Sequence, residues 1–365
     1  MPSATPETTL WDADPHTFVK HRLLRRYLGA WYEILRKGGH RRLALVDGFC
    51  GPGEYGKGEV GSPVIALEVA CASSNVDNPP LYTVLFIDER ADRLRHLEEV
   101  VLPRREYPPN IKYQCRHGAF AQVMSEALDS YGERNPPPMF AFVDPFGFSG
   151  VPMSLLQRIM ARERSEVFLT FMARDINRFI DDSPKQSSIV EFFGTPDVLK
   201  IDRSDSRIEQ LLAIYQDQWR QRTESLFIGT FRMTNRNDSI IYYLIFLTKH
   251  VAGFRAMKRA MWYEDKGGDF KFSDGTNPMQ GTLLTLNHEG QLLKQLQERF
   301  AGQRVTVEAV RRFVDESTIY LDSHMRQSLK LGETQGVVIP DPVKADGKKR
   351  IGRTFPNEVT VTFMA

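Results

Sequence analysis

The sequence has few cysteines and no long apolar run. Cys50, Cys71 and Cys115 are the only cysteines among 365 residues. Three thiols far apart form neither a disulfide framework nor a zinc site, and they fit a reducing cytoplasm. No apolar run approaches the roughly 20 residues that a membrane-spanning helix needs, and residues 1–14 lack the regions of a secretory signal. We therefore expect a cytoplasmic protein with no membrane and no metal site.

Excess charge of one sign is also absent. The 48 Lys and Arg residues nearly balance 46 Asp and Glu residues, which leaves a formal net charge of +2. Any contact with nucleic acid must therefore come from local basic patches. A chain of 365 residues is long for one domain, so we expect two domains.

Apolar stretches alternate with helical patterns over the first half of the chain. The expected strands cover residues 42–49, 81–88, 111–115, 139–143 and 167–171, and the expected helices 17–35, 62–71, 91–100, 119–131 and 154–160. This alternation predicts an α/β fold with a parallel sheet and helices on both faces. Residues 231–235 and 240–249 flank a polar turn and predict an antiparallel hairpin, a feature of the class I methyltransferase fold.

The boundaries of this Rossmann-like core follow from the same patterns. Residues 1–15 are expected to form a flexible tail and residues 16–285 the core domain, with a helical insertion at about 175–225. Basic residues crowd the first helix, and we interpret them as a solvated face rather than a phosphate-binding one: Lys20, His21, Arg22, Arg25 and Arg26.

A glycine-rich loop follows the first expected strand. Glycines there allow positive φ and a close approach of the backbone to a ligand. Asp47 ends that strand, where an acid commonly faces the amino-acid part of S-adenosylmethionine, and Asp88 ends the second strand, where an acid binds ribose hydroxyls. The predicted cofactor-binding residues are Asp47, Gly48, Gly51, Gly53, Ser62 and Asp88. The structural alternative is that the glycines merely turn the chain.

The segment from Gly51 to Gly58 also nearly matches a nucleotide-binding P-loop, and residues 140–144 resemble its partner motif. A P-loop needs Ser or Thr after its lysine to bind Mg²⁺, and Gly58 occupies that position after Lys57. Ser62 and Pro63 form a better helix start, with Ser62 as N-cap. Nucleotide binding is therefore an inferior alternative.

The segment Asp144-Pro145-Phe146-Gly147 follows the fourth expected strand. Amino-methyltransferases that act on bases carry an acid or Asn, then two prolines and an aromatic residue at this place. The acid and a proline carbonyl orient an exocyclic amine, and the ring stacks on a flipped base. Here Phe146 replaces the second proline, so a packed turn is an equal alternative. We assign Asp144, Pro145 and Phe146 as candidate catalytic residues, and His117 as a structural or loop histidine rather than a catalytic base.

These motifs, in this order, resemble the three-Cys-motif partner family over residues 16–265. The resemblance rests on His16-Thr17 to Trp31, Val46 to Gly53, Gly61-Ser62-Pro63, Phe86-Ile87-Asp88 and Phe142 to Gly147. It implies a class I methyltransferase-like fold and a three-cysteine radical-SAM-like iron–sulfur protein as partner. It also implies a role in nucleic-acid modification or repair, with Asp47, Gly51, Gly53 and Asp88 as cofactor residues.

Residues 286–365 have the pattern of a winged-helix domain. Three expected helices, 290–300, 306–314 and 323–331, precede strands 336–340 and 358–363 that bracket a basic loop. Arg326 and Lys330 lie on the third helix, and Lys348, Lys349 and Arg350 on the wing. These are the candidate nucleic-acid-binding residues, for DNA or RNA. The alternative is a domain that contacts protein.

Two functions are compatible with these patterns. The chain is either an S-adenosylmethionine-dependent nucleic-acid methyltransferase or a non-catalytic adaptor that recruits nucleic acid to the iron–sulfur partner.

Overall fold

The computed structural model describes residues 7–130, 136–224, 226–265, 267–273, 287–343 and 347–364. The chain divides into two compact units. Unit 1 comprises residues 1–264 and 271–276, and unit 2 comprises residues 265–270 and 277–365. The expected boundary at residue 286 lies outside the described residues.

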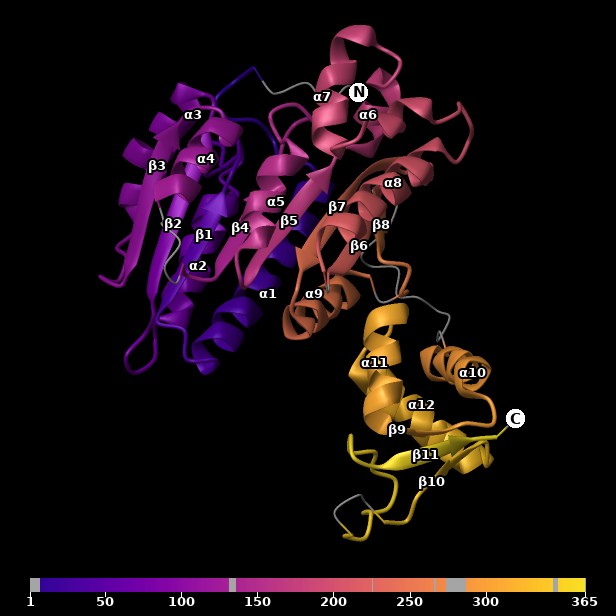
Figure 1. The fold of residues 1–365 in the computed structure, drawn as a ribbon. Helices are drawn as coiled ribbons and strands as arrows, with labels where there is room; N and C mark the ends of the chain where they lie inside the picture. Colours follow the sequence, from indigo (N-terminus) through magenta and orange to yellow (C-terminus); the bar gives the residue numbers. More distant parts are fainter. Residues whose placement is uncertain are drawn as a thin grey trace. The chain divides into compact units, whose positions relative to one another are not determined.

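Unit 1 is built on one large sheet. Its strands are β1 (Arg42–Asp47), β2 (Leu81–Asp88), β3 (Ile111–His117), β4 (Met139–Val143), β5 (Ser165–Phe171), β6 (Phe227–Thr234), β7 (Ile240–Thr248) and β8 (Lys271–Ser273). They lie in the order β3-β2-β1-β4-β5-β7-β6-β8 (Figure 1). The first five strands are parallel to one another, whereas β7 is antiparallel to both β5 and β6. The predicted parallel sheet followed by an antiparallel hairpin is confirmed, and the short β8 adds one more strand beside β6.

Helices cover both faces of this sheet. They are α1 (Pro15–Lys37), α2 (Ser62–Ser73), α3 (Ala91–His96), α4 (Phe120–Ser130), α5 (Met153–Ala161), α6 (Ala173–Phe179), α7 (Ser183–Phe193), α8 (Arg207–Arg222) and α9 (Val251–Glu264). Successive residues of β4 point to opposite faces. Phe140 packs on Tyr27 and Trp31 of α1, at ring-centre distances of 5.3 and 5.9 Å, whereas Ala141 packs in the core formed with α4 and α5. Both faces are therefore apolar.

Two local signals explain where the first helices begin. Asp14 caps α1, because its carboxylate accepts a hydrogen bond from the Thr17 amide at 2.7 Å, and Pro15 occupies the first turn. The expectation that Ser62 caps α2 is wrong, since Gly61 is the N-cap residue and Ser62 begins the helix. The reason is steric: a Cβ on Gly61 would lie 2.9 Å from the backbone of Gly53, so this position accepts only glycine.

Unit 2 contains α10 (His288–Phe300), β9 (Arg304–Thr306), α11 (Val307–Ser317), α12 (Asp322–Gln335), β10 (Val338–Pro340) and β11 (Thr360–Phe363). The three strands form an antiparallel sheet in the order β10-β11-β9. Buried apolar side chains from all three helices and from β11 form its core, including Leu296, Val310, Leu329 and Phe363. The sequence patterns predicted the three helices but not β9, which is only three residues long.

No helix in the described part of the chain is long and apolar enough to cross a bilayer.

Candidate functional site

Three acids lie at the same edge of the sheet because parallel strands end together. β1 lies between β2 and β4, and Asp47 is in register with Phe86 of β2 and with Phe142 of β4. Asp88 and Asp144 each follow these partners by two residues. In open α/β sheets, ligands bind at such a point, where the strand order reverses at the carboxyl ends. The sequence placed these acids at strand ends, and the structure brings the three ends side by side.

The glycine loop after β1 is held by Asp88. Gly51 has a φ of +61°, a conformation that favours glycine. Its amide donates to the Asp88 carboxylate at 2.9 Å, while the Arg90 amide donates to the other carboxylate oxygen at 2.8 Å. Farther along, the Gly61 amide donates to the Gly53 carbonyl at 2.7 Å, so the loop closes onto the start of α2.

Asp47 is a buried acid at the end of the central strand. Only 1% of it is exposed. Among the residues that the structure describes, none completes a hydrogen bond to either carboxylate oxygen. Burial raises the pKa of Asp47 to about 7, an effect that the nearby Ser62 hydroxyl and Phe49 amide offset only in part. An unpaired buried carboxylate destabilises a fold, so this position suits a bound cationic group.

Asp144 of the Asp-Pro-Phe-Gly segment is fixed by two donors. Lys20 Nζ of α1 lies 2.5 Å from its Oδ2, and the Thr170 hydroxyl of β5 donates to its Oδ1 at 2.5 Å. The interpretation of Lys20 and His21 as part of a solvated face is wrong, because they are only 8% and 7% exposed. Burial lowers the pKa of His21 to about 3, which keeps its imidazole neutral. The pairing with Asp144 explains the burial of the lysine.

Two cavities adjoin these residues. The first has a volume of about 560 Å³ and includes the glycine loop, Lys20, Ser62, Asp144 and Tyr242 in its wall. The second, of about 490 Å³, includes Asp88, Arg90, Arg93 and residues of α6 and α7. Phe49, Pro145 and Phe146 line both. The cavities therefore meet at the Asp-Pro-Phe segment, one beside the glycine loop and the other beside Asp88.

Two further sequence assignments fall on the rim of this site. His117 is the last residue of β3 and contacts the Glu89 carbonyl through Nε2 at 3.1 Å, so it is a structural histidine with a partner. Lys57 of the near P-loop match lies on an exposed turn before α2 and pairs with Asp12 at 3.0 Å. A P-loop places its lysine at the start of the helix, so this loop lacks that geometry.

The basic residues of unit 2 separate into two groups. Arg326 donates to Asp322 at 2.9 Å and to the Phe355 carbonyl, and Arg350 lies 2.5 Å from Glu333 with its side chain 7% exposed. Both therefore stabilise the fold of unit 2. The remaining candidates are exposed: Lys330, Lys348 and Lys349.

Comparison with protein-family models gives no match, and comparison with curated proteins gives none. Solved structures give distant similarities. Trm1 from Pyrococcus horikoshii in complex with S-adenosyl-L-methionine is 13% identical, with a TM-score of 0.36, over 71% of this chain and 61% of that one. A Legionella pneumophila protein is 11% identical, with a TM-score of 0.37, over 64% of this chain and 84% of that one. A SAM-dependent methyltransferase from Anabaena variabilis is 8% identical, with a TM-score of 0.26, over 67% and 100%.

The match spans about three-fifths of the Trm1 chain, and scores this low carry no argument about activity. The sheet itself is more informative. Its order, the antiparallel β7 and the glycine loop at the point of reversal define a Rossmann-like α/β core in unit 1.

Proposed function

We propose that this protein binds S-adenosylmethionine at the carboxyl edge of the sheet and transfers its methyl group to a nucleic acid. The observation that carries the proposal is Asp47, a buried carboxylate that no described residue pairs with, at the end of the central strand beneath a glycine loop. S-adenosylmethionine supplies an electrophilic methyl group, and its amino-acid end carries the ammonium group that such an acid would pair with.

The other residues of the edge fit the same ligand. Asp88 lines the second cavity and retains acceptor capacity for ribose hydroxyls, since each of its oxygens accepts only one of the hydrogen bonds named above. Gly51 and Gly53 line the first cavity together with Ser62 and keep the loop backbone close to the ligand. Gly48 lines neither cavity and packs against Phe120, where a Cβ would lie 2.6 Å from the ring. Cavities of about 560 and 490 Å³ are in the range of small-molecule sites.

The acceptor would be oriented by Asp144. Lys20 and Thr170 hold its carboxylate in one orientation, and this preorganisation favours a fixed position for an exocyclic amine. The Pro145 carbonyl is a second acceptor for that amine, and Phe146 offers a ring on which a base can stack. Asp144 and Phe146 both line the first cavity with the glycine loop.

Unit 2 would present the nucleic acid. The order of its elements supports a winged helix with α12 as the third helix: β9 lies between α10 and α11, and β10 and β11 follow α12. Lys330 on α12 and the exposed Lys348 and Lys349 are the residues suited to phosphate contact.

The adaptor function is the second candidate, and one observation favours it. Lys20 already pairs with Asp144, which leaves the acid less capacity to accept from a substrate amine. In that case the protein would hold nucleic acid for the three-cysteine radical-SAM-like iron–sulfur partner that the family resemblance implies. Failure to co-purify with such a partner would contradict this candidate.

Calorimetric titration of the full chain with S-adenosylmethionine tests the proposal, with ATP–Mg²⁺ titrated in parallel. We expect binding with a Kd on the order of micromolar that weakens at least about tenfold in Asp47→Asn. The matched control is Asp129→Asn, an exposed acid of α4 that pairs with Arg158, and it should bind as the wild type does. Equal binding by Asp47→Asn and wild type would refute the role of Asp47, and binding of ATP alone would refute the proposal.

A further inference from the structure

The segment before α1 lies against the glycine loop. We call residues 8–13 the N-terminal strap; they belong to the stretch that the sequence predicts as a flexible tail. The Gly56 amide donates to the Trp11 carbonyl at 2.8 Å, and Asp12 pairs with Lys57 at 3.0 Å. The ring of Trp11 covers Gly51, because a Cβ on that glycine would lie 3.6 Å from it. The strap therefore covers the loop that we assign to the cofactor.

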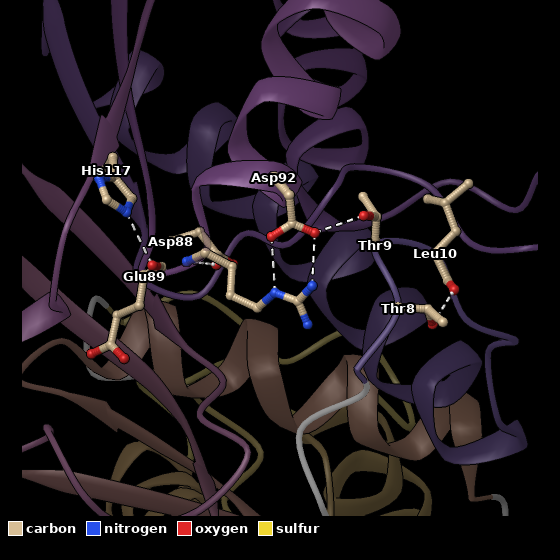
Figure 2. A network of polar contacts seen from close by, with 8 residues as sticks. Thr8, Thr9, Leu10, Asp88, Glu89, Asp92 and His117 are labelled. Carbon is tan, nitrogen blue, oxygen red and sulfur yellow. Dashed lines mark hydrogen bonds and ion pairs between the residues drawn. The ribbon is translucent and has the colours of Figure 1, made fainter.

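A second attachment fastens the strap to α3 (Figure 2). The Thr9 hydroxyl donates to the Asp92 carboxylate at 2.6 Å, and the Arg90 guanidinium pairs with the same carboxylate at 2.7 Å. These contacts hold the pKa of Asp92 well below its usual range. Asp92 lies in α3, which begins three residues after Asp88, so the strap links the loop after β1 to the helix after β2.

Trp11 stands where the two cavities meet. Its ring lines the first cavity, whereas Arg93 lines the second. The Arg93 guanidinium lies 4.5 Å from the centre of the Trp11 ring and 5.3 Å from that of Phe146, and the two rings are 6.0 Å apart. These three side chains, which we call the Trp11 stack, separate the space beside the glycine loop from the space beside Asp88.

The position of Asp47 adds an independent observation. This buried acid, unpaired among the described residues, belongs to the wall of neither cavity. Tyr55, whose ring centre lies 5.5 Å from that of Trp11 in a T-shaped arrangement, belongs to the loop that follows β1. A ligand that reaches from Asp88 to the glycine loop must cross the Trp11 stack, and one that also contacts Asp47 must displace the side chains that bury it.

We propose that the N-terminal strap gates the cofactor site, so that S-adenosylmethionine enters when Trp11 leaves the stack. This inference rests on the proposed binding of S-adenosylmethionine. The attachments of the strap are suited to reversible opening, because the Lys57 and Asp12 side chains are 70% and 64% exposed and such ion pairs are weak. Binding energy at Asp47 and Asp88 would then offset the loss of the stack.

Tryptophan emission of the full chain reports the displacement directly. The chain has four tryptophans, and Trp31, Trp219 and Trp262 are buried in unit 1. We expect S-adenosylmethionine to shift the emission to longer wavelength as Trp11 moves into water. Trp11→Phe should remove this shift, and Trp262→Phe should retain it. Calorimetry on each variant measures binding separately from emission.

Stopped-flow association gives a second measurement. Deletion of residues 1–13 keeps the Asp14 cap of α1, and it should raise the association rate about tenfold if the strap is open about a tenth of the time. The double variant Asp12→Asn with Lys57→Met, in the full-length chain, should also raise the association rate. The matched control is Asp197→Asn with Lys200→Met, which removes a similarly exposed ion pair at 2.6 Å elsewhere in unit 1 and should leave the rate unchanged.

The outcomes separate the gate from the cofactor assignment. The gate would be overturned if calorimetry shows binding, the tryptophan emission does not shift and the strap variants associate at the wild-type rate. The proposed function would then remain intact. Absence of binding in both the wild type and the deletion variant would overturn both proposals. Binding by the deletion variant alone would support a strap that closes the site.

Discussion

Lys20 of α1 lies 2.5 Å from the carboxylate of Asp144, a residue 124 positions away in the sequence. The contact joins the first helix of unit 1 to the Asp-Pro-Phe-Gly segment at the end of β4. It shows that the acid of this segment already belongs to a partly buried ion pair in the ligand-free fold. The remaining acceptor capacity of Asp144 and the unused donors of Lys20 are then available to a base edge with both donor and acceptor groups.

The first prediction concerns this pair. Lys20→Met should lower the free energy of unfolding by about 1–3 kcal/mol, because Asp144 keeps its charge and loses its partner. Asp144→Asn in the same chain should recover part of the loss. A double-mutant cycle by urea unfolding measures the coupling, which we expect to be about 1–2 kcal/mol. Additive effects of the two substitutions would contradict the ion pair.

The second prediction is the pH dependence of cofactor binding. The pKa of Asp47 is raised to about 7, mainly by burial, and only the ionised carboxylate attracts an ammonium group. As the pH increases towards 7, the affinity for S-adenosylmethionine should therefore rise by up to about tenfold per pH unit. Above pH 7 the affinity should level off, because the carboxylate is then ionised. Calorimetry at pH 6, 7 and 8 measures this slope, and Asp47→Asn should remove it. A slope that persists in Asp47→Asn would assign the titration to another group.

The third prediction concerns stability and Glu166. Burial raises the pKa of this glutamate from 4.5 to about 7, although the Tyr27 hydroxyl donates to it and Thr248 donates to it at 2.7 Å. A raised acid pKa means that the folded state binds more protons, so stability falls as pH rises from about 4.5 to 7. The full loss is about 3 kcal/mol. Asp47 acts in the same direction and over the same window.

Glu166→Gln tests this assignment, because the amide is neutral at every pH. Urea unfolding of unit 1 at pH 5 and pH 8 should show a smaller pH dependence than in the wild type, with the variant more stable at pH 8. An equal pH dependence in both proteins would show that Glu166 does not titrate in this range.

The fourth prediction uses two glycines. A Cβ on Gly61 would lie 2.9 Å from the Gly53 backbone, so Gly61→Ala should displace the glycine loop, lower stability by about 1–3 kcal/mol and weaken S-adenosylmethionine binding. A Cβ on Gly29 of α1 would meet no described atom within 4 Å. Gly29→Ala should therefore stabilise the protein by up to about 1 kcal/mol without affecting binding. Thermal unfolding and calorimetry distinguish the two effects.

The fifth prediction concerns unit 2. The double variant Lys348→Ala with Lys349→Ala should bind tRNA or duplex DNA more weakly than the wild type. The slope of log affinity against log salt concentration should also become less negative, by up to about 2. Lys37→Ala, an exposed lysine at the end of α1, is the control. Unchanged affinity and salt dependence in the double variant would contradict the phosphate-binding role of this loop.

Part of the Asp47 site was predictable because the ends of strands follow from local patterns. Apolar runs that end in an acid or a glycine loop place Asp47, Asp88 and Asp144 at strand ends, and parallel strands bring those ends to one edge. The burial of Lys20 was not predictable in this way. A lysine among arginines on a helix has the local pattern of a solvated face, and only a distant carboxylate makes its burial favourable.

The sequence by itself determined the alternating strands and helices, the glycine loop and the acids that follow the strands, because hydrophobic periodicity and backbone conformation act over short stretches of chain. Only the tertiary structure decided which of these groups are buried and with what partners. It left Asp47 unpaired among the described residues, paired Lys20 with Asp144, and placed Trp11 over Gly51. The physical reason is that desolvation and charge pairing depend on distances between residues far apart in the chain, which no local pattern specifies.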